Sequence, residues 1–162
     1  MNRVPLISVI IPTYNSAKTI KTCLKAIIGQ NYPKDRFEII VVDNYSKDRT
    51  VNISESLGAK LYLQEGIPPQ VCLQRNFGAE KAKGEYLFFL DHDMEMSRNL
   101  FKNFAEKALE QNDNIDAWYI PERIIGNGYV AYDRKGIFNV GLEINSSRHI
   151  LSCAICKETL IN

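Results

Sequence analysis

Short apolar runs alternate along this chain with longer stretches in which apolar residues recur at helical spacing. The first run, Ile7 to Ile11, is rich in β-branched residues and is closed by Pro12, which predicts a buried strand. The next segment predicts an amphipathic helix, because its apolar residues lie at i, i+3, i+4, i+7 and i+8 (Ile20, Cys23, Leu24, Ile27 and Ile28).

Further apolar runs predict strands at residues 37–42, 60–63, 86–90 and 117–120. Strands that alternate with helices of crossover length return parallel to one another, because each crossover is right-handed. We therefore predict an α/β fold: a mostly parallel, doubly wound, Rossmann-like sheet with flanking helices.

The segments between those strands carry helix signals. Asp48 and Gly58 are suited to begin and end a helix, since aspartate caps N-termini and glycine accepts the left-handed conformation. A loop rich in glycine and proline, residues 64–70, precedes a predicted helix over residues 71–83. Ser97 is predicted to cap a further helix with this buried stripe: Leu100, Phe101, Phe104, Ala105, Ala108 and Leu109.

The composition is that of a soluble globular protein with one core. Apolar residues make up 45% of the 162 residues and charged residues 24%, which are ordinary values. The 20 basic and 19 acidic residues nearly balance, so the net charge gives no reason to expect a nucleic acid partner. Since no secretory signal and no run of about 20 apolar residues is present, we expect a cytoplasmic protein.

The cysteines leave two interpretations open. Cys153 and Cys156 form a C-x-x-C motif, which is half of a zinc site or a redox pair in some proteins. No second such motif follows, and the surrounding ILSCAIC segment has the pattern of a buried strand. We therefore favour reduced, structural thiols, including Cys23 on the apolar side of the first predicted helix.

Polar residues gather just past three of the predicted strands, where ligands bind in sheets of this kind. They form three short segments: Pro12–Asn15, Asp43–Ser46 and Asp91–Asp93. The turn after the first strand contains no glycine, so neither a dinucleotide-binding loop nor a P-loop is present. A bound phosphate group would therefore need another source of positive charge.

The triplet Asp91-His92-Asp93 can supply that charge by holding a cation. Carboxylates two residues apart just beyond a strand can both approach one hard cation, and such cations prefer oxygen ligands. The alternative is a solvated loop in which Asp93 or Ser97 only caps the following helix. The strand YLFFL before the triplet favours the metal site, and we expect His92 to point away from it.

Three other residues each have a binding and a structural interpretation. Asp43 could accept hydrogen bonds from a base or a ribose, or it could stabilise a turn. Tyr14 could stack on a base, or its ring could lie half buried under a loop. Arg75 could bind a diphosphate through two hydrogen bonds, or it could be an ordinary solvated arginine on a helix.

Taken together, these segments resemble the family-2 glycosyltransferases of the GT-A fold. The matching stretches are ISVIIPTYNSAKTIKTCLKAIIGQNYP, FEIIVVDNYSKDRT, RNFGAEKAKGEYLFFLDHDM and, more weakly, SCAICKETLIN. The resemblance implies sugar transfer, with inversion at the anomeric carbon, from a nucleotide-diphospho-sugar such as a UDP- or GDP-sugar. It further implies a Mg²⁺ or Mn²⁺ ion and an acceptor that is a saccharide or a lipid-linked saccharide.

The resemblance also assigns roles to individual positions. It implies nucleotide-sugar binding by Pro12, Tyr14, Asp43, Arg75 and Asp91, and metal binding by Asp93 and Asp91 in a DxD motif. Tyr14 and Asp43 would hold the base and ribose, and Arg75 would lie against the nucleotide. The ion would then act as a Lewis acid on the leaving nucleoside diphosphate.

One feature of the family is missing. Its general base is a carboxylate in an acidic motif that follows a glycine-glycine-aromatic-aspartate turn, and this chain stops at Asn162, about where that turn should begin. The remaining acidic residues do not lie in that motif: Glu122, Asp133, Glu143 and Glu158. We expect residues 1–121 to form the nucleotide-sugar-binding half and residues 122–162 to begin an acceptor-side region, truncated within a single domain, with the catalytic base unknown.

Two other functions stay open. One is a donor-binding module, or a truncated transferase, that binds the nucleotide-sugar with little or no transfer. The other is a nucleotidyltransferase, although such an enzyme would carry a glycine-rich, basic loop after the first strand, and PTYNSA is not such a loop. Membrane association through a segment outside this sequence is compatible with a lipid-linked acceptor.

Overall fold

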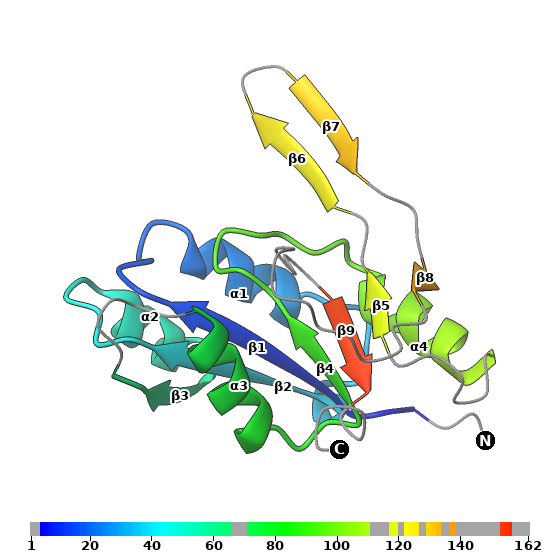
Figure 1. Cartoon of the computed structure of the whole chain (residues 1–162), viewed down its shortest axis with the longest axis horizontal. Helices are drawn as coiled ribbons and strands as arrows, with labels where there is room; N and C mark the ends of the chain where they lie inside the picture. The colour runs from blue at the N-terminus through cyan, green and yellow to red at the C-terminus, as the bar shows by residue number, and fades with distance from the viewer. Residues whose placement is uncertain are drawn as a thin grey trace.

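The centre of the fold is one mixed sheet. The computed structural model describes residues 4–65, 71–110, 117–119, 122–126, 129–133, 137–138 and 153–156. Within them, the sheet has seven strands in the order β3-β2-β1-β4-β9-β5-β8 (Figure 1). Its parallel part consists of β3 (Lys60–Leu63), β2 (Phe37–Asp43), β1 (Ile7–Thr13) and β4 (Tyr86–Phe89). The predicted α/β fold with a mostly parallel sheet is confirmed.

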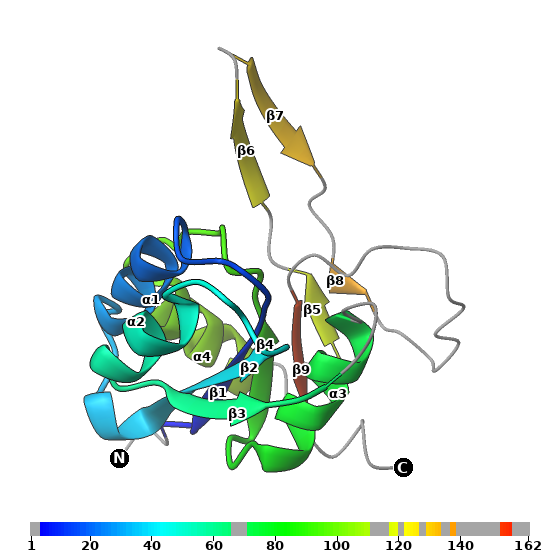
Figure 2. The ribbon, with the colours of Figure 1, turned by 90° about the vertical axis from the view of Figure 1, so that its left-hand side faces the viewer.

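The rest of the sheet is antiparallel. Strand β9 (Cys153–Cys156) lies between β4 and β5 (Ala117–Tyr119) and runs antiparallel to both, and β8 (Ile137–Phe138) pairs with β5. Strands β6 (Glu122–Gly126) and β7 (Tyr129–Asp133) form a separate hairpin that projects from the sheet (Figure 2). The strand predicted in the ILSCAIC segment is confirmed, whereas its cysteine side chains lie outside the described part of the chain.

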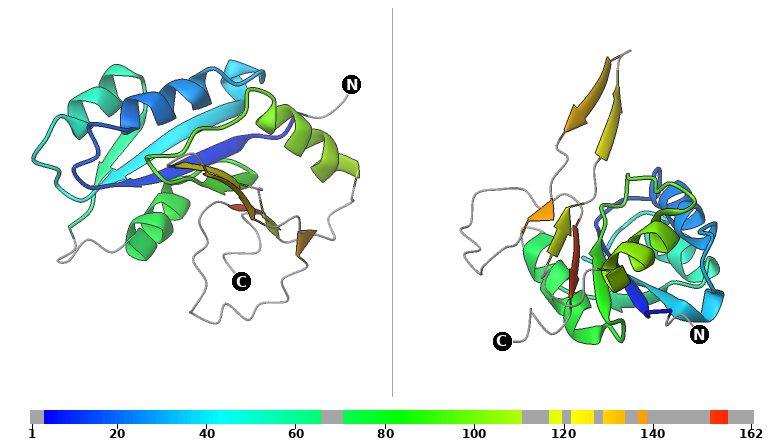
Figure 3. Two further views of the ribbon diagram at one scale, coloured as in Figure 1. Left: turned by 90° about the horizontal axis from the view of Figure 1, so that it is seen from above. Right: turned by 90° about the vertical axis from the view of Figure 1, so that its right-hand side faces the viewer.

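Helices cover both faces of the parallel strands (Figure 3). Helices α1 (Ile20–Ile28), α2 (Thr50–Ser56) and α4 (Leu100–Glu110) pack on one face. Helix α3 (Val71–Lys81) packs on the other face, and a short 3-10 turn, η1 (Lys34–Arg36), precedes β2. The chain is therefore doubly wound, as predicted.

The central strand contributes to the core on both faces of the sheet. Val9 and Ile11 belong to the core under α1 and α4, whereas Ile10 belongs to the core under α3. This alternation is the period of two expected for a strand buried on both sides. Phe88 of β4 meets Phe101 of α4 edge to face, with ring centroids 5.3 Å apart.

The first strand is longer than predicted. The sequence predicts that Pro12 closes it, but β1 continues through Pro12 to Thr13. Proline fits there because the pairing of β1 with β4 ends at Ile10 and Phe89, so its missing N–H removes no bond of that ladder.

Most predicted helix features are confirmed, with shifts at the ends. Gly58 has a φ of 78°, the left-handed stop expected after α2. Ile28 and Leu109 are predicted to be buried but are exposed, whereas the preceding residues Ile27 and Ala108 are buried, so each exposed residue lies at the margin of its helix's apolar face. Helix α3 ends at Lys81 instead of Lys83, since the Lys83 N–H donates to Glu38 Oε1 and leaves the helical pattern.

The predicted division after residue 121 falls on residues outside the description, and so do Glu143 and Glu158. Glu122 and Asp133 pair in register at the open end of the β6–β7 hairpin. In the part of the chain that the structure describes, no helix has both the length and the apolar character needed to cross a bilayer.

Candidate functional site

The loops that follow β1, β2 and β4 meet at the carboxyl edge of the parallel strands (Figure 1). The β1–β2 ladder ends at the pair Thr13 and Asp43, and the β1–β4 ladder ends at Ile10 and Phe89. Asp91 follows β4 after a single residue, Leu90, whose N–H donates to the Ile10 carbonyl oxygen at 3.0 Å. All three predicted polar segments therefore lie at one edge.

Asp43 is fully buried and joins the ends of β1 and β2. Its Oδ2 accepts hydrogen bonds from Thr13 Oγ1 at 2.8 Å and from Ser46 Oγ at 2.6 Å. Its Oδ1 accepts the Ser46 N–H at 2.7 Å. These contacts agree with the turn interpretation of Asp43, and its contact with a base or a ribose stays a prediction.

The loops after β1 and β2 are further joined by hydrogen bonds across their tips. The Asn15 N–H donates to Ser46 Oγ at 2.8 Å, and the Lys47 N–H donates to Asn15 Oδ1 at 2.8 Å. The Ala17 N–H donates to Asp48 Oδ2 at 3.0 Å. The two loops therefore form one structural unit beside Asp43.

Asp48 has the predicted role at the start of α2, since its Oδ1 accepts the N–H of Thr50, the first residue of that helix, at 2.9 Å. Burial raises the pKa of Asp48, but hydrogen bonds from Thr50 and from the Ala17 backbone together lower it below its ordinary value. The carboxylate of Asp48 therefore serves both the helix and the neighbouring loop.

Two tyrosine rings are exposed at this edge. Tyr14 is 47% exposed and Tyr45 is 46% exposed. This exposure leaves the ring of Tyr14 accessible for stacking on a base, which stays a prediction, and is equally compatible with the alternative of a half-buried ring. Tyr45 and Asn15 have φ values of 55° and 51°, in the left-handed region that bulky residues rarely adopt. Sequence reasoning gave Tyr45 no role.

Arg75 of α3 reaches across the edge to Asp91. Its Nη2 lies 2.7 Å from Asp91 Oδ1, and the two side chains are only 18% and 27% exposed. The alternative of an ordinary solvated arginine is therefore wrong. The structure therefore brings together two of the residues to which the resemblance assigns nucleotide-sugar binding.

Asp93 is exposed, and its neighbour His92 is turned elsewhere. His92 Nδ1 lies 2.9 Å from Thr19 Oγ1, just before α1, which agrees with the expectation that His92 points away from the metal position. Beneath them Cys23 is a buried free thiol whose Sγ donates to the Asp91 carbonyl oxygen at 3.6 Å. Burial, followed by the negative charges of Asp93, Asp91 and Glu95, raises the pKa of Cys23 to about 12.

The donor atoms at this edge suit a hard divalent cation. Asp91 and Asp93 offer carboxylate oxygens, and no group of three or more metal-binding side chains converges within the described ranges. Mg²⁺ is commonly bound by one or two protein carboxylates, and phosphate oxygens and water complete its coordination shell. The residues therefore fit Mg²⁺ or Mn²⁺ better than a zinc ion, which takes nitrogen and sulfur ligands.

Sequence reasoning missed three residues of this edge. Thr13 and Ser46 lie in the segments already singled out, and each donates to Asp43. Gln74 lies beside Arg75 and is buried, with its Nε2 donating to two strand carbonyls. No sequence signal marks Gln74, because glutamine is also common on exposed helix faces.

Both a protein family and individual curated proteins resemble this chain in sequence. A family model described as "Glycosyl transferase family 2" matches residues 8–156. The glycosyltransferase AglE of Haloferax volcanii is 41% identical over 93 residues, which are 55% of this chain and 31% of that protein. The poly(ribitol-phosphate) β-N-acetylglucosaminyltransferase TarS of Staphylococcus aureus is 35% identical over 115 residues, which are 67% of this chain and 20% of TarS.

Solved structures share the fold. The crystal structure of S. aureus TarS 1–349 superposes with a TM-score of 0.64 at 34% identity, covering 69% of this chain and 34% of that one. The same TarS fragment has been solved in complex with UDP-GlcNAc (TM-score 0.61, 32% identity, coverage 69% and 33%). The mannosyltransferase PcManGT of Pyrobaculum calidifontis, in complex with GDP-Man and Mn²⁺, has a TM-score of 0.58 at 27% identity, with coverage of 71% and 35%.

This chain spans between 20% and 35% of the lengths of these proteins. The family match nevertheless extends over most of the chain, from residue 8 to residue 156. The chain therefore belongs to glycosyltransferase family 2 and has its GT-A fold.

Proposed function

We propose that this chain binds the nucleoside diphosphate of a nucleotide-sugar at the carboxyl edge of its sheet, together with a divalent cation, for sugar transfer with inversion. The observation that carries the proposal is the juxtaposition of the Arg75–Asp91 ion pair with the exposed carboxylate of Asp93. The relatives solved with UDP-GlcNAc and with GDP-Man and Mn²⁺ support this class of donor and cofactor.

The base and ribose would lie beside the joined loops after β1 and β2. Tyr14 offers an exposed ring for stacking on a base, with the buried Pro12 two residues before it. A carboxylate has acceptor sites for about four hydrogen bonds, and Thr13 and Ser46 supply three to Asp43. One acceptor site of Asp43 is therefore unused, and because the residue has no exposed surface, its contact with the nucleotide would require these loops to move.

The diphosphate would lie between Asp93 and Arg75. Asp93, supported by Asp91, would hold the cation, which when bound offsets the negative charge that develops on the leaving diphosphate. Arg75 keeps Asp91 oriented through the 2.7 Å contact, so that fewer rearrangements are needed when the donor arrives. Inversion corresponds to attack by an acceptor hydroxyl on the face opposite the diphosphate, and we assign its general base to none of the described residues.

Nucleotide titration tests this proposal. We expect UDP or GDP to bind this chain with Mn²⁺ and to bind at least about tenfold more weakly after chelation, as for a ligand held through a metal. In Asp93→Asn the affinity should fall to the chelated level and lose its dependence on Mn²⁺. Isothermal titration calorimetry measures both.

Glu55→Gln is the matched control, because Glu55 is an exposed residue of α2 and its loss removes one negative charge away from this edge. Its affinity and its Mn²⁺ dependence should equal those of the wild type. If Asp93→Asn binds nucleotide as tightly as the wild type, with the same response to Mn²⁺, the site is assigned to the wrong residues.

Donor binding without transfer is the second candidate function, since the proposed site assigns residues to the donor and the cation but a general base to none of the described residues. Release of free sugar from UDP-GlcNAc or GDP-Man in the presence of Mn²⁺ would indicate a transferase site active toward water. Binding without such release would support a donor-binding role. The family match disfavours the nucleotidyltransferase alternative, while the cytoplasmic location and the saccharide or lipid-linked acceptor stay predictions.

A further inference from the structure

We propose that Gln74 is a positioning residue of the donor site. Its buried amide fixes α3 to the last residues of β1 and β2 and thereby holds Arg75 in place against Asp91. This inference rests on the proposed donor function and adds a residue that touches neither the nucleotide nor the metal.

The contacts of Gln74 are unusual for a helix glutamine. The side chain is only 3% exposed, and its Nε2 donates to the Thr13 carbonyl oxygen at 3.0 Å and to the Val42 carbonyl oxygen at 2.7 Å. Burying an amide is unfavourable unless it is hydrogen-bonded, so this group is held firmly where its two acceptors lie. These acceptors belong to the residues immediately before Tyr14 and Asp43.

A second anchor lies one turn further along α3, on the same helix face. At Gly78 a Cβ atom would lie 2.5 Å from Ile10 Cγ2 and 3.2 Å from Val42 Cγ2, so the helix backbone packs directly on the sheet there. Close packing at Gly78 sets the distance between α3 and the sheet. The two bonds of Gln74 add a directional constraint at the end of the helix nearest the donor site.

Arg75 is the next residue after Gln74, so any movement of the helix at Gln74 moves Arg75 as well. Its Nη2 contacts Asp91 Oδ1 at 2.7 Å, at the end of β4. Through Gln74 and Arg75, the first turns of α3 therefore connect three strand ends: those of β1, β2 and β4. Loss of the amide should loosen Asp91 as well as the helix.

A polar network at the opposite end of the sheet offers a matched control. Ser8 Oγ donates to Glu38 Oε1 at 2.6 Å and accepts the Gly84 N–H at 2.8 Å. It therefore fixes the segment that follows α3 to the beginning of β1, remote from Asp91. A variant of Ser8 should weaken the packing of the same helix without reaching the donor site.

The experiment compares Gln74→Met, Arg75→Met, the double variant and Ser8→Ala by calorimetric titration of UDP and GDP with Mn²⁺ and by thermal unfolding. We expect Gln74→Met to weaken nucleotide binding by about tenfold, which lies within the usual range of coupling between residues in contact. The double variant should bind no more weakly than Arg75→Met. Ser8→Ala should lower the Tm and leave nucleotide affinity unchanged.

Two results would overturn the inference. One is a Gln74→Met variant with a lowered Tm and the nucleotide affinity of the wild type. The other is a double variant in which the two losses of affinity multiply, since independent residues give additive free energies.

If the proposed function itself is wrong, the wild type will bind neither UDP nor GDP at any Mn²⁺ concentration, which distinguishes that outcome from failure of the Gln74 inference. In that event a crystal structure of Gln74→Met tests the positioning directly. An Arg75 Nη2 to Asp91 Oδ1 contact as short as in the parent structure would contradict the inference, and its loss would support it.

Discussion

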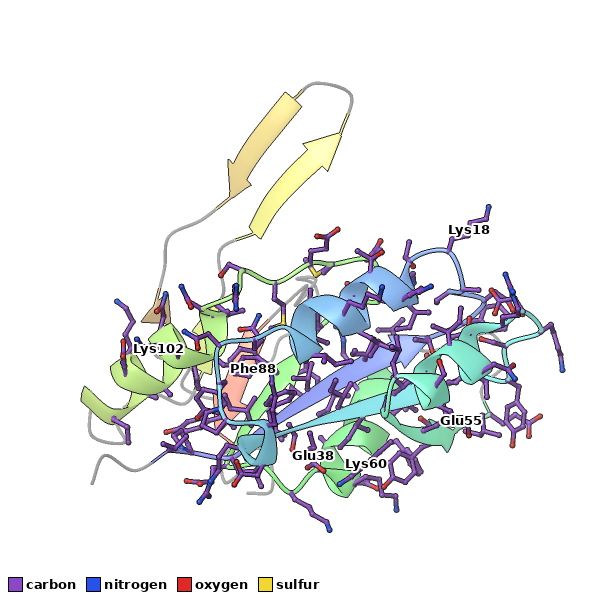
Figure 4. The ribbon with its side chains drawn as sticks, turned by 180° about the vertical axis from the view of Figure 1, so that it is seen from behind. Lys18, Glu38, Glu55, Lys60, Phe88 and Lys102 are labelled. Carbon is purple, nitrogen blue, oxygen red and sulfur yellow. The ribbon has the colours of Figure 1, made fainter. Side chains whose placement is uncertain are left out.

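The two ends of the parallel sheet each carry a carboxylate that bridges strands, partly buried at the amino end and fully buried at the carboxyl end, but they balance its charge differently. At the amino end, Glu38 accepts from Ser8 and the Lys83 backbone and forms an ion pair with Lys60 at 2.5 Å, which Figure 4 shows beside it. At the carboxyl end, Asp43 accepts from the hydroxyl and amide groups of Thr13 and Ser46, which are neutral.

This difference is consistent with the proposed binding function of the carboxyl end. The cation of Lys60 neutralises Glu38 within the protein, so the amino end is complete without a ligand. The carboxyl end keeps the negative charges of Asp43 and the exposed Asp93, with Arg75 committed to Asp91. Carboxylate oxygens placed in this way are suited to recruit a divalent cation, which can then hold a diphosphate.

Replacement of Asp43, the buried carboxylate at the carboxyl end, should have the largest effect on the free energy of unfolding. In Asp43→Ala, Thr13 and Ser46 lose the acceptor for three hydrogen bonds, one of them buried and two partly buried. An unsatisfied buried donor costs about 1–3 kcal/mol, so we expect the free energy of unfolding to fall by about 3 kcal/mol. Urea denaturation measures this, and an Asp43→Ala protein as stable as the wild type would contradict the role of Asp43 as a structural bridge.

A smaller loss is expected at the amino end. Glu38→Gln keeps the shape of the side chain but removes the charge that pairs with Lys60 and strengthens its hydrogen bonds. We expect the free energy of unfolding to fall by about 2 kcal/mol, the usual contribution of a hydrogen bond to a charged group. Nucleotide affinity should not change, and a change in affinity would show that the two ends are not separate.

The same variant should change the acid dependence of stability. Burial alone would raise the pKa of Glu38, but the hydrogen bonds from Lys60, Ser8 and the Lys83 backbone lower it below its ordinary value. The contribution of Glu38 is therefore complete above the unfolded pKa of about 4.3 and is lost as the pH falls through the lower folded pKa. Below that window, wild type and Glu38→Gln should approach equal stability in urea titrations; a constant difference at every pH would contradict this.

The smallest effect is a gain in stability. Tyr45 has a φ of 55°, a conformation that is unfavourable by roughly 1–2 kcal/mol for residues with a Cβ atom and is free of strain for glycine. Tyr45→Gly should therefore raise the free energy of unfolding by up to about 1 kcal/mol. Tyr14→Gly, at a neighbouring exposed ring without positive φ, should lower it, and equal changes in the two variants would argue against strain at Tyr45.

The parallel sheet and the residues at its carboxyl edge could be predicted from the sequence, because both depend on the local pattern of apolar and polar residues. Buried β-branched runs such as Ile7 to Ile11 mark strands, and the strand-end rule then places Tyr14, Asp43 and Asp91 together. The Arg75–Asp91 pair and the buried Gln74 could not be predicted, because they depend on how deeply α3 packs on the sheet at Gly78. The position of β9 in the sheet could not be predicted either, because an apolar run indicates a strand but does not identify the strands with which it pairs.

The place of β9 has a consequence for the synthesis of this protein. Strand β9 separates β4 from β5, although β5 precedes it in the chain. While the nascent chain leaves the ribosome, β1 to β4 can pair as soon as they emerge, but the outer edge of β4 stays without its partner strand until residue 153 arrives. Exposed strand edges template association with other chains, so a chain released before β9 should be prone to aggregate through β4.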